Sequence, residues 1–142
     1  MISIEIALKF AMDKHKGQVD KSGAPYIEHV MRVAEKVKRD EEKIVALLHD
    51  VVEDTSTSLE EIESLGVSDE IIKAIDLLTH KKDSNYYDYI RNISKNNLAK
   101  VVKLADLEDN TDVRRMEKLP NDLKQRLLKK YELALSILNE GK

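Results

Sequence analysis

The chain has 142 residues, of which 42% are hydrophobic and 36% charged, and its net charge is −3. This composition is typical of one globular domain, and the charge gives no reason to expect a nucleic-acid or anionic-membrane partner. The absence of cysteine excludes disulfides and thiolate ligands, so any metal must be bound by His, Asp, Glu or water. We expect a single domain over residues 1–142, without a signal peptide or membrane span and located in the cytoplasm.

Helical periodicity runs through almost the whole chain, beginning with three expected helices in the first 52 residues. Ser3 is a suitable N-cap for a helix that continues to about residue 16, where Gly17 ends it. A polar loop over 18–25 follows, and two more helices are predicted over about 27–38 and 41–52.

The second half of the chain predicts five more helices. Ser58 and Glu61 form a capping-box pattern for a short helix that ends at Gly66, and Ser68 is a cap for a helix over 69–78. Ser84 is expected to cap the next. The remaining helices are predicted at about 84–94, 98–115 and 121–139, with no strand alternation or repeat anywhere.

The segment 44–54, IVALLHDVVED, contains the densest group of ionisable residues in the chain. At about 100° per residue, one arc of this helix holds all four ionisable side chains and the opposite arc holds the branched aliphatics. A solvated acidic face at a helix end is the simpler interpretation. However, the polar residues follow an unbroken apolar run directly, and acidic groups near a helix C-terminus are unfavourable, so a site is favoured. The four residues are His49, Asp50, Glu53 and Asp54.

Two further residues are candidate partners for this group. His29 lies at the start of the second helix, in PYIEHV, where a lone histidine is often structural. Asp106 lies in VVKLADLEDN and shares a helical stripe with Lys103, Asn110 and Val113. An aspartate one turn after a lysine is often only an ion pair. Both residues remain open between a structural role and a ligand role.

Together these residues form an H…HD…D pattern, which resembles the HD-domain phosphohydrolases. The segments HKGQVDKSGAPYIEH, ALLHDVVEDT and VKLADLEDN closely resemble, in that order, the hydrolase half of the RelA/SpoT enzymes. Those enzymes act on the alarmones ppGpp and pppGpp. The resemblance covers about residues 7–110 and implies a compact all-α HD bundle of about eight helices. It also implies a stand-alone alarmone hydrolase whose partner is a small-molecule nucleotide.

The resemblance also implies a role for individual residues. The ligands of one divalent metal, usually Mn²⁺ in this family, are matched by His29, His49, Asp50 and Asp106. The catalytic acidic pair is matched by Glu53 and Asp54, and the nucleotide contacts by Lys21, Ser22 and, near the ribose, Asn110. The residue types alone would also suit Fe, Co, Ni or Zn.

Three departures from the family pattern concern recognition of the base. The family commonly carries Arg-Lys where this chain has Asp20-Lys21, and usually Thr at the position of Val113. The usual ADRLHN reads ADLEDN, which places Leu107 and Asp109 at the Arg and His positions. Asp20 is expected either to accept hydrogen bonds from a base or to leave the base loosely held, unless it is only a solvated loop residue.

Because of these departures, two alternatives remain beside a ppGpp pyrophosphohydrolase. One is an HD hydrolase of a different nucleotide, of the 5′-nucleotidase or dinucleotide-phosphatase type. The other is a regulatory HD module that binds a nucleotide without turnover, which the intact acidic pair argues against.

Overall fold

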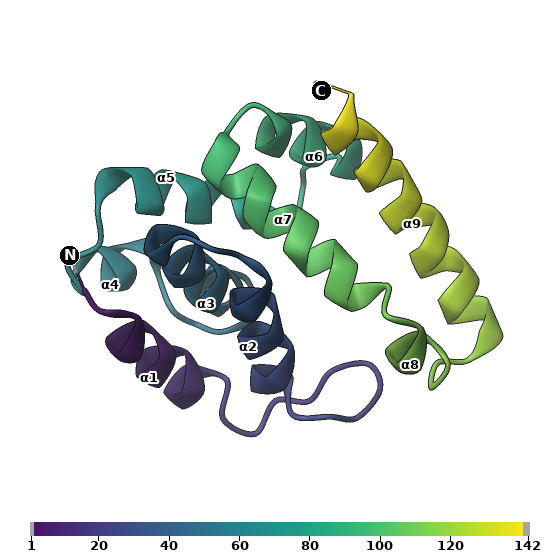
Figure 1. The fold of residues 1–142 in the computed structure, drawn as a ribbon, viewed down its shortest axis with the longest axis horizontal. Helices are drawn as coiled ribbons and strands as arrows, with labels where there is room; N and C mark the ends of the chain where they lie inside the picture. Colours follow the sequence, from purple (N-terminus) through teal and green to yellow (C-terminus); the bar gives the residue numbers. More distant parts are fainter. Residues whose placement is uncertain (1, 141–142) are drawn as a thin grey trace.

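Helix α3 (Asp40–Asp54) lies among the other helices in this computed structural model, which describes residues 2–140 (Figure 1). It packs against α1 (Ile4–Lys14), α2 (Tyr26–Lys36), α5 (Asp69–Leu78) and α7 (Asn97–Asn110). Every residue over 44–51 is buried. A helix that is buried around its whole circumference needs an apolar surface on all sides. The run that precedes His49 therefore makes α3 the central helix of the fold.

The remaining helices extend the bundle beyond α3. In Figure 1, α6 (Tyr86–Ser94) and α9 (Asn121–Asn139) lie side by side, and α9 also packs on α7. Two short helices connect larger ones: α4 (Leu59–Glu63) and α8 (Val113–Met116). The all-α prediction is confirmed, with nine helices over residues 2–140.

Three of the four predicted serine caps are confirmed by their hydrogen bonds. The hydroxyls of Ser3 and Ser68 accept from the backbone N–H groups of Ile6 and Ile71. Ser58 forms the predicted capping box with Glu61. These contacts satisfy N–H groups that have no partner within their own helix.

Two predicted helix boundaries are wrong, each because a nearby polar side chain competes for the backbone. The helix expected over 98–115 ends at Asn110, and the Asp112 side chain accepts from the backbone of Arg114 and so starts α8 as a separate helix. The cap of α6 is Asn85, not Ser84. The Ser84 hydroxyl donates to the Lys81 carbonyl oxygen instead. Short polar side chains commonly redirect the chain in this way.

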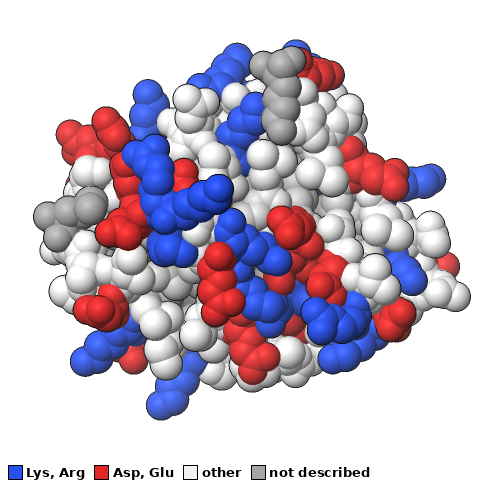
Figure 2. Space-filling model, in the orientation of Figure 1, with Lys and Arg blue, Asp and Glu red and all other residues white. Residues whose placement is uncertain are grey.

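The surface of the described residues shows mixed charge. On the face drawn in Figure 2, acidic and basic side chains are interspersed rather than gathered into regions of one sign. None of the helices within residues 2–140 is long and apolar enough to cross a membrane.

Candidate active site

Three helices bring the predicted metal-ligating side chains together. His29 comes from α2, His49 and Asp50 from α3, and Asp106 from α7, and all four are buried. Ligand atoms of His29, Asp50 and Asp106 lie within 4.8 Å of one another. Nε2 of His29 is 2.8 Å from Oδ1 of Asp106. Residues 77 positions apart in sequence thus meet in one small polar volume.

His49 completes this group from the adjacent position on α3. Its Nδ1 lies 2.9 Å from the Ala46 carbonyl oxygen, which can only accept, so Nδ1 carries the proton. Its Nε2 is buried and has no hydrogen-bond partner among the described residues, yet it lies 3.1 Å from Oδ1 of Asp50. In the neutral ring a lone pair then faces a carboxylate oxygen. A divalent cation between them would convert both atoms into ligands, so these residues fit a metal.

His29 is held from both sides of its ring. Nδ1 donates to Oδ2 of Asp109 at 2.6 Å, while Nε2 faces Asp106. Burial lowers the pKa of His29, but the hydrogen bonds to Asp106 and Asp109 outweigh it and raise the pKa to about 9. A carboxylate behind a histidine is the usual arrangement that orients a metal-ligating ring.

The two candidate carboxylate ligands also have fixed orientations. The Tyr26 hydroxyl donates to Oδ2 of Asp50 at 2.6 Å, and the Lys103 ammonium donates to Oδ2 of Asp106 at 3.2 Å. Burial raises the pKa of the Asp106 carboxyl, but the charge of Lys103 and the hydrogen bond from His29 hold it far below its ordinary value. The Asp106 carboxylate therefore stays ionised, and each of the two carboxylates has a hydrogen-bond partner on a neighbouring turn or helix that fixes its rotamer.

The predicted catalytic pair lies one turn further along α3. Oxygen atoms of Asp50, Glu53 and Asp54 lie within 4.8 Å of one another. Glu53 accepts a 2.6 Å hydrogen bond from the backbone N–H of His80. Asp54 lies in the wall of a cavity, where reduced solvation, with the charges of Asp50 and Glu53, raises its pKa to about 6. A carboxyl with this pKa can carry a proton near neutral pH.

A cavity of about 500 Å³ opens beside the acidic pair. This volume is in the range of small-molecule sites. Its polar side contains the three predicted nucleotide contacts, Lys21, Ser22 and Asn110, and its apolar side contains Met116, Leu119 and Leu127. Val113, expected on the stripe of Asp106, is absent from this lining and is 68% exposed, because the chain breaks before α8.

A second cavity, of about 230 Å³, contains His49, Asp50 and Asp106 and shares Tyr26, Glu53 and Asn110 with the first. Two cations, Lys103 and Lys130, also line it. Burial lowers the pKa of Lys130, and the positive charges of Lys21 and Lys103 lower it further. Lys103 and Lys130 at this cavity and Lys21 at the first are three cations that can pair with a polyanionic ligand.

Asp20 is neither solvated nor available to a base. Its side chain is 4% exposed, and Oδ1 accepts from the Ser22 N–H, the Ser22 hydroxyl and the Ala24 N–H at 2.7–3.0 Å. Oδ2 pairs with Arg115 at 2.9 Å. Burial raises the Asp20 pKa, but these hydrogen bonds outweigh it and lower the pKa overall. The expectation that Asp20 is a solvated loop residue is therefore wrong, and its hydrogen bonds within the protein argue against acceptance from a base. That this position leaves the base loosely held stays a prediction.

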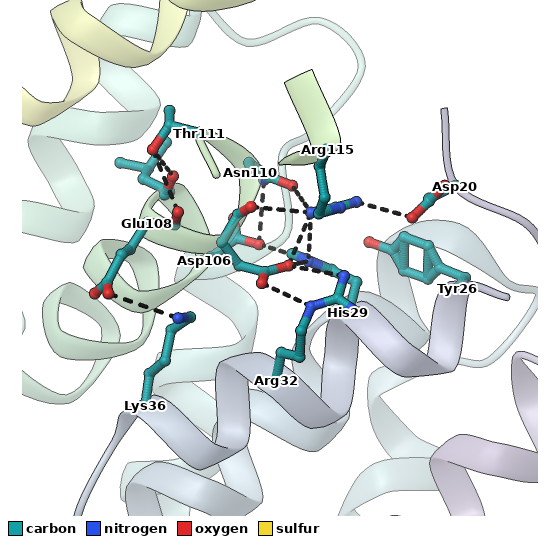
Figure 3. A network of polar contacts seen from close by, with 12 residues as sticks. Asp20, Tyr26, His29, Arg32, Lys36, Asp106, Glu108, Asn110, Thr111 and Arg115 are labelled. Carbon is teal, nitrogen blue, oxygen red and sulfur yellow. Dashed lines mark hydrogen bonds and ion pairs between the residues drawn. The ribbon is translucent and has the colours of Figure 1, made fainter. Parts of the chain in front are cut away.

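Three residues of the site were not identified as site residues from the sequence. Tyr26 is visible there only as a residue that stiffens a helix entry, and Asp109 only as a departure from the family pattern. Arg115 contacts Asp20 (Figure 3) and Asp109. The family pattern has basic residues at the positions of Asp20 and Asp109, and two buried carboxylates require a cation between them. That requirement is the only indication of Arg115 in the sequence. Nothing in the local sequence shows that positions 95 residues apart would meet.

Comparisons with known proteins agree with the site. A family model described as the HD domain matches residues 7–129. The guanosine-3′,5′-bis(diphosphate) 3′-pyrophosphohydrolase of Aquifex aeolicus is 36% identical over 118 residues, covering 75% of this chain and 17% of that protein. The Drosophila melanogaster enzyme of that name, MESH1, is 36% identical over 115 residues, covering 72% of this chain and 64% of that protein.

A solved structure is also similar over most of its length. It is described as a metazoan ortholog of SpoT that hydrolyses ppGpp, and it superimposes with a TM-score of 0.82 at 26% identity. The match covers 96% of this chain and 85% of that one. The chain thus spans less than two thirds of the length of the two curated relatives above, but most of this solved chain.

Proposed function

The chain belongs to the HD-domain family, and we propose that it is a metal-dependent pyrophosphohydrolase of a ppGpp-like nucleotide. The products would be GDP and pyrophosphate. The observation that carries the proposal is the buried, unpartnered Nε2 of His49, set beside Asp50 and next to the acidic pair. The names of the relatives and of the solved structure support the choice of substrate.

The proposed metal site consists of His29, His49, Asp50 and Asp106. When bound, a divalent ion supplies Lewis-acid polarisation of a phosphoryl oxygen and lowers the pKa of a water molecule. We propose Mn²⁺ as the ion, because two imidazoles and two carboxylates suit it and the resemblance to the RelA/SpoT enzymes favours it.

The acidic pair would transfer the protons of the reaction. Glu53 takes a proton from the attacking water, whose oxygen bonds to the phosphorus attached to the ribose 3′ oxygen. Asp54 gives a proton to that 3′ oxygen as its bond to phosphorus breaks. The pKa of about 6 at Asp54 supports this assignment, since the group can be protonated before the step and ionised after it.

The two connected cavities fit two parts of such a substrate. The smaller one, with Lys103 and Lys130, suits the 3′ pyrophosphate, and the larger one suits the nucleoside and the 5′ phosphates near Lys21. Lysine neutralises phosphate as a compact point charge. The apolar wall of the larger cavity favours a second candidate, an HD hydrolase of another nucleotide, because that wall offers few polar groups to select a base.

A metal and substrate panel tests the proposal. Purified protein is stripped with chelator, titrated with Mn²⁺ in a calorimeter, and assayed for phosphate and pyrophosphate release. The panel contains ppGpp, its adenine analogue, nucleoside monophosphates and dinucleotides. We expect Mn²⁺ binding, a melting temperature raised by the metal, and pyrophosphate release from ppGpp. Release only from another nucleotide would establish the second candidate, and binding without turnover would overturn both enzymatic assignments.

A further inference from the structure

Arg115 contacts two different parts of the site at once. Its Nη2 atom donates to Oδ2 of Asp20 at 2.9 Å (Figure 3), and its Nη1 atom donates to Oδ2 of Asp109 at 2.8 Å. The Arg115 side chain is 19% exposed, and those of Asp20 and Asp109 are 4% and 3% exposed. Ion pairs this well shielded from water are stronger than surface pairs and are costly to break by removing one partner.

On one side of Arg115 lies the loop that carries Lys21 and Ser22. Asp20 organises this loop internally through hydrogen bonds to Ser22 and Ala24. Gln18 joins it to the Asp54 carbonyl oxygen. Within residues 2–140, the Asp20–Arg115 pair is the only side-chain hydrogen bond that joins this loop to α7 or α8. Arg115 therefore sets how the loop sits against the α7 side of the larger cavity.

On the other side of Arg115 lies the ring of His29. Asp109 accepts from Nδ1 of His29 and from Arg32 as well as from Arg115. Arg115 Nη1 also contacts the backbone carbonyl oxygen of Asp109. The carboxylate behind His29 is thus fixed by two guanidinium groups. Carboxylates in this position set the orientation of the imidazole, and their loss weakens metal binding.

From these contacts we propose that Arg115 is a positioning residue that joins the loop of Lys21 and Ser22 to the ring of His29. It acts through Asp20 on one side and Asp109 on the other, and it need not touch the substrate. The proposal rests on the proposed function, because that function assigns nucleotide binding to the loop of Lys21 and Ser22 and metal binding to His29. The planar guanidinium is suited to this role because it can donate to two carboxylates in fixed directions, which a lysine ammonium does less well.

The test compares Arg115→Gln with Arg114→Gln. Arg114 is the matched control, since it is the neighbouring arginine of α8, is 90% exposed and, among residues 2–140, pairs only with Asp112. Arg115→Gln should weaken Mn²⁺ affinity by about tenfold or more. It should also raise the KM for ppGpp by about tenfold at saturating Mn²⁺, with a smaller change in kcat. Arg114→Gln should change neither. A change in only one of the two quantities, or in neither, overturns the proposal.

Single variants at each end separate the two functions of Arg115. Asp20→Asn should raise KM and leave Mn²⁺ affinity close to that of the wild type, while Asp109→Asn should do the reverse. The KM effects of Asp20→Asn and Arg115→Gln should be clearly non-additive in a double-mutant cycle, because the two residues share one contact. Additive effects would show that the ion pair does not transmit the change. If Arg115→Gln does not fold, Mn²⁺ affinity and the KM for ppGpp are measured in Arg115→Lys, which keeps the charge but not the two fixed donor directions.

Two readouts do not depend on turnover. Mn²⁺ titration reports on the His29 end, and hydrogen exchange of the backbone amides over 20–24 reports on the loop end. Exchange there should become faster in Arg115→Gln and stay unchanged in Arg114→Gln. A wild-type protein that releases no pyrophosphate would overturn the proposed function alone, and these two readouts would still decide the role of Arg115. A wild-type protein that binds no Mn²⁺ would overturn both.

Discussion

The hydroxyl of Tyr26, the first residue of α2, donates a 2.6 Å hydrogen bond to Oδ2 of Asp50 in the middle of α3. Burial raises the pKa of Tyr26 far above its ordinary value, and the Asp50 charge raises it further. The phenol therefore stays protonated and donates to Asp50 at neutral pH. Its contact leaves Oδ1 of Asp50 as the oxygen that faces His49.

Removing this donor should weaken the metal site without unfolding the protein. For Tyr26→Phe we expect Mn²⁺ affinity to fall by about tenfold, the lower end of the range for partners behind metal ligands. Isothermal titration measures it, with Tyr87→Phe as control. Tyr87 is exposed, and its hydroxyl bonds only to Arg91 within the part of the chain that the structure describes. Equal affinities in Tyr26→Phe and wild type would show that Tyr26 does not orient Asp50.

Glu53→Gln should abolish proton transfer while keeping the structure. The amide oxygen of glutamine can still accept from the His80 N–H, as Glu53 does, so α3 should end in the same way. We expect Mn²⁺ binding to persist and kcat for ppGpp to fall by a factor of ~10² to 10⁴, the usual contribution of a positioned acid or base. Glu60→Gln, on the exposed face of α4, should keep wild-type rates. A Glu53→Gln protein with full activity would contradict the assignment.

Asp20→Ala should destabilise the fold rather than change base preference. The substitution removes an acceptor used by Ser22, Ala24 and Arg115. Because water can replace part of this bonding, we expect the free energy of unfolding to fall by ~1–2 kcal/mol. Urea denaturation measures the loss, and Asp13→Ala, on the exposed surface of α1, should cause none. Unchanged stability in Asp20→Ala would mean that its hydrogen bonds are replaced without cost.

Discrimination between guanine and adenine should be weak, because part of the larger cavity is lined by apolar side chains. Its lining includes Met116, Leu119 and Leu127, and apolar side chains do not distinguish the hydrogen-bonding edges of the two bases. We expect kcat/KM for ppGpp and its adenine analogue to differ by less than about tenfold, or ~1.4 kcal/mol. A hundredfold preference for guanine would require a selective polar contact from a residue other than these.

Much of the fold follows from local rules that a sequence displays directly. Ser3, Ser58 and Ser68 satisfy N–H groups a few positions away, so the starts of three helices could be predicted. The break after Asn110 could not, because an aspartate at position 112 can either lie within a continuous helix or cap a new one. The convergence of His29, His49, Asp50 and Asp106 was predicted from the family pattern, and the structure places these four side chains close together.

The partners behind the predicted ligands depend on tertiary contacts instead. Asp109 was visible only as a departure from the usual histidine, and its function depends on Arg32 and Arg115, from α2 and α8. A single sequence carries no information on which distant charges become neighbours. The same limit explains why the ion pair of Asp20 was not predicted, since its partner is 95 residues away.

Because Arg115 of α8 pairs with Asp20, the 18–25 loop cannot be exchanged for that of a relative without also changing α8. The RelA/SpoT enzymes that the chain resembles commonly carry arginine at the position of Asp20. A chimera that received only the 18–25 loop from such an enzyme would place that guanidinium against Arg115 in a poorly hydrated contact, with no carboxylate between them. The loop and the 111–116 segment thus form one exchangeable unit, although 85 residues of chain separate them.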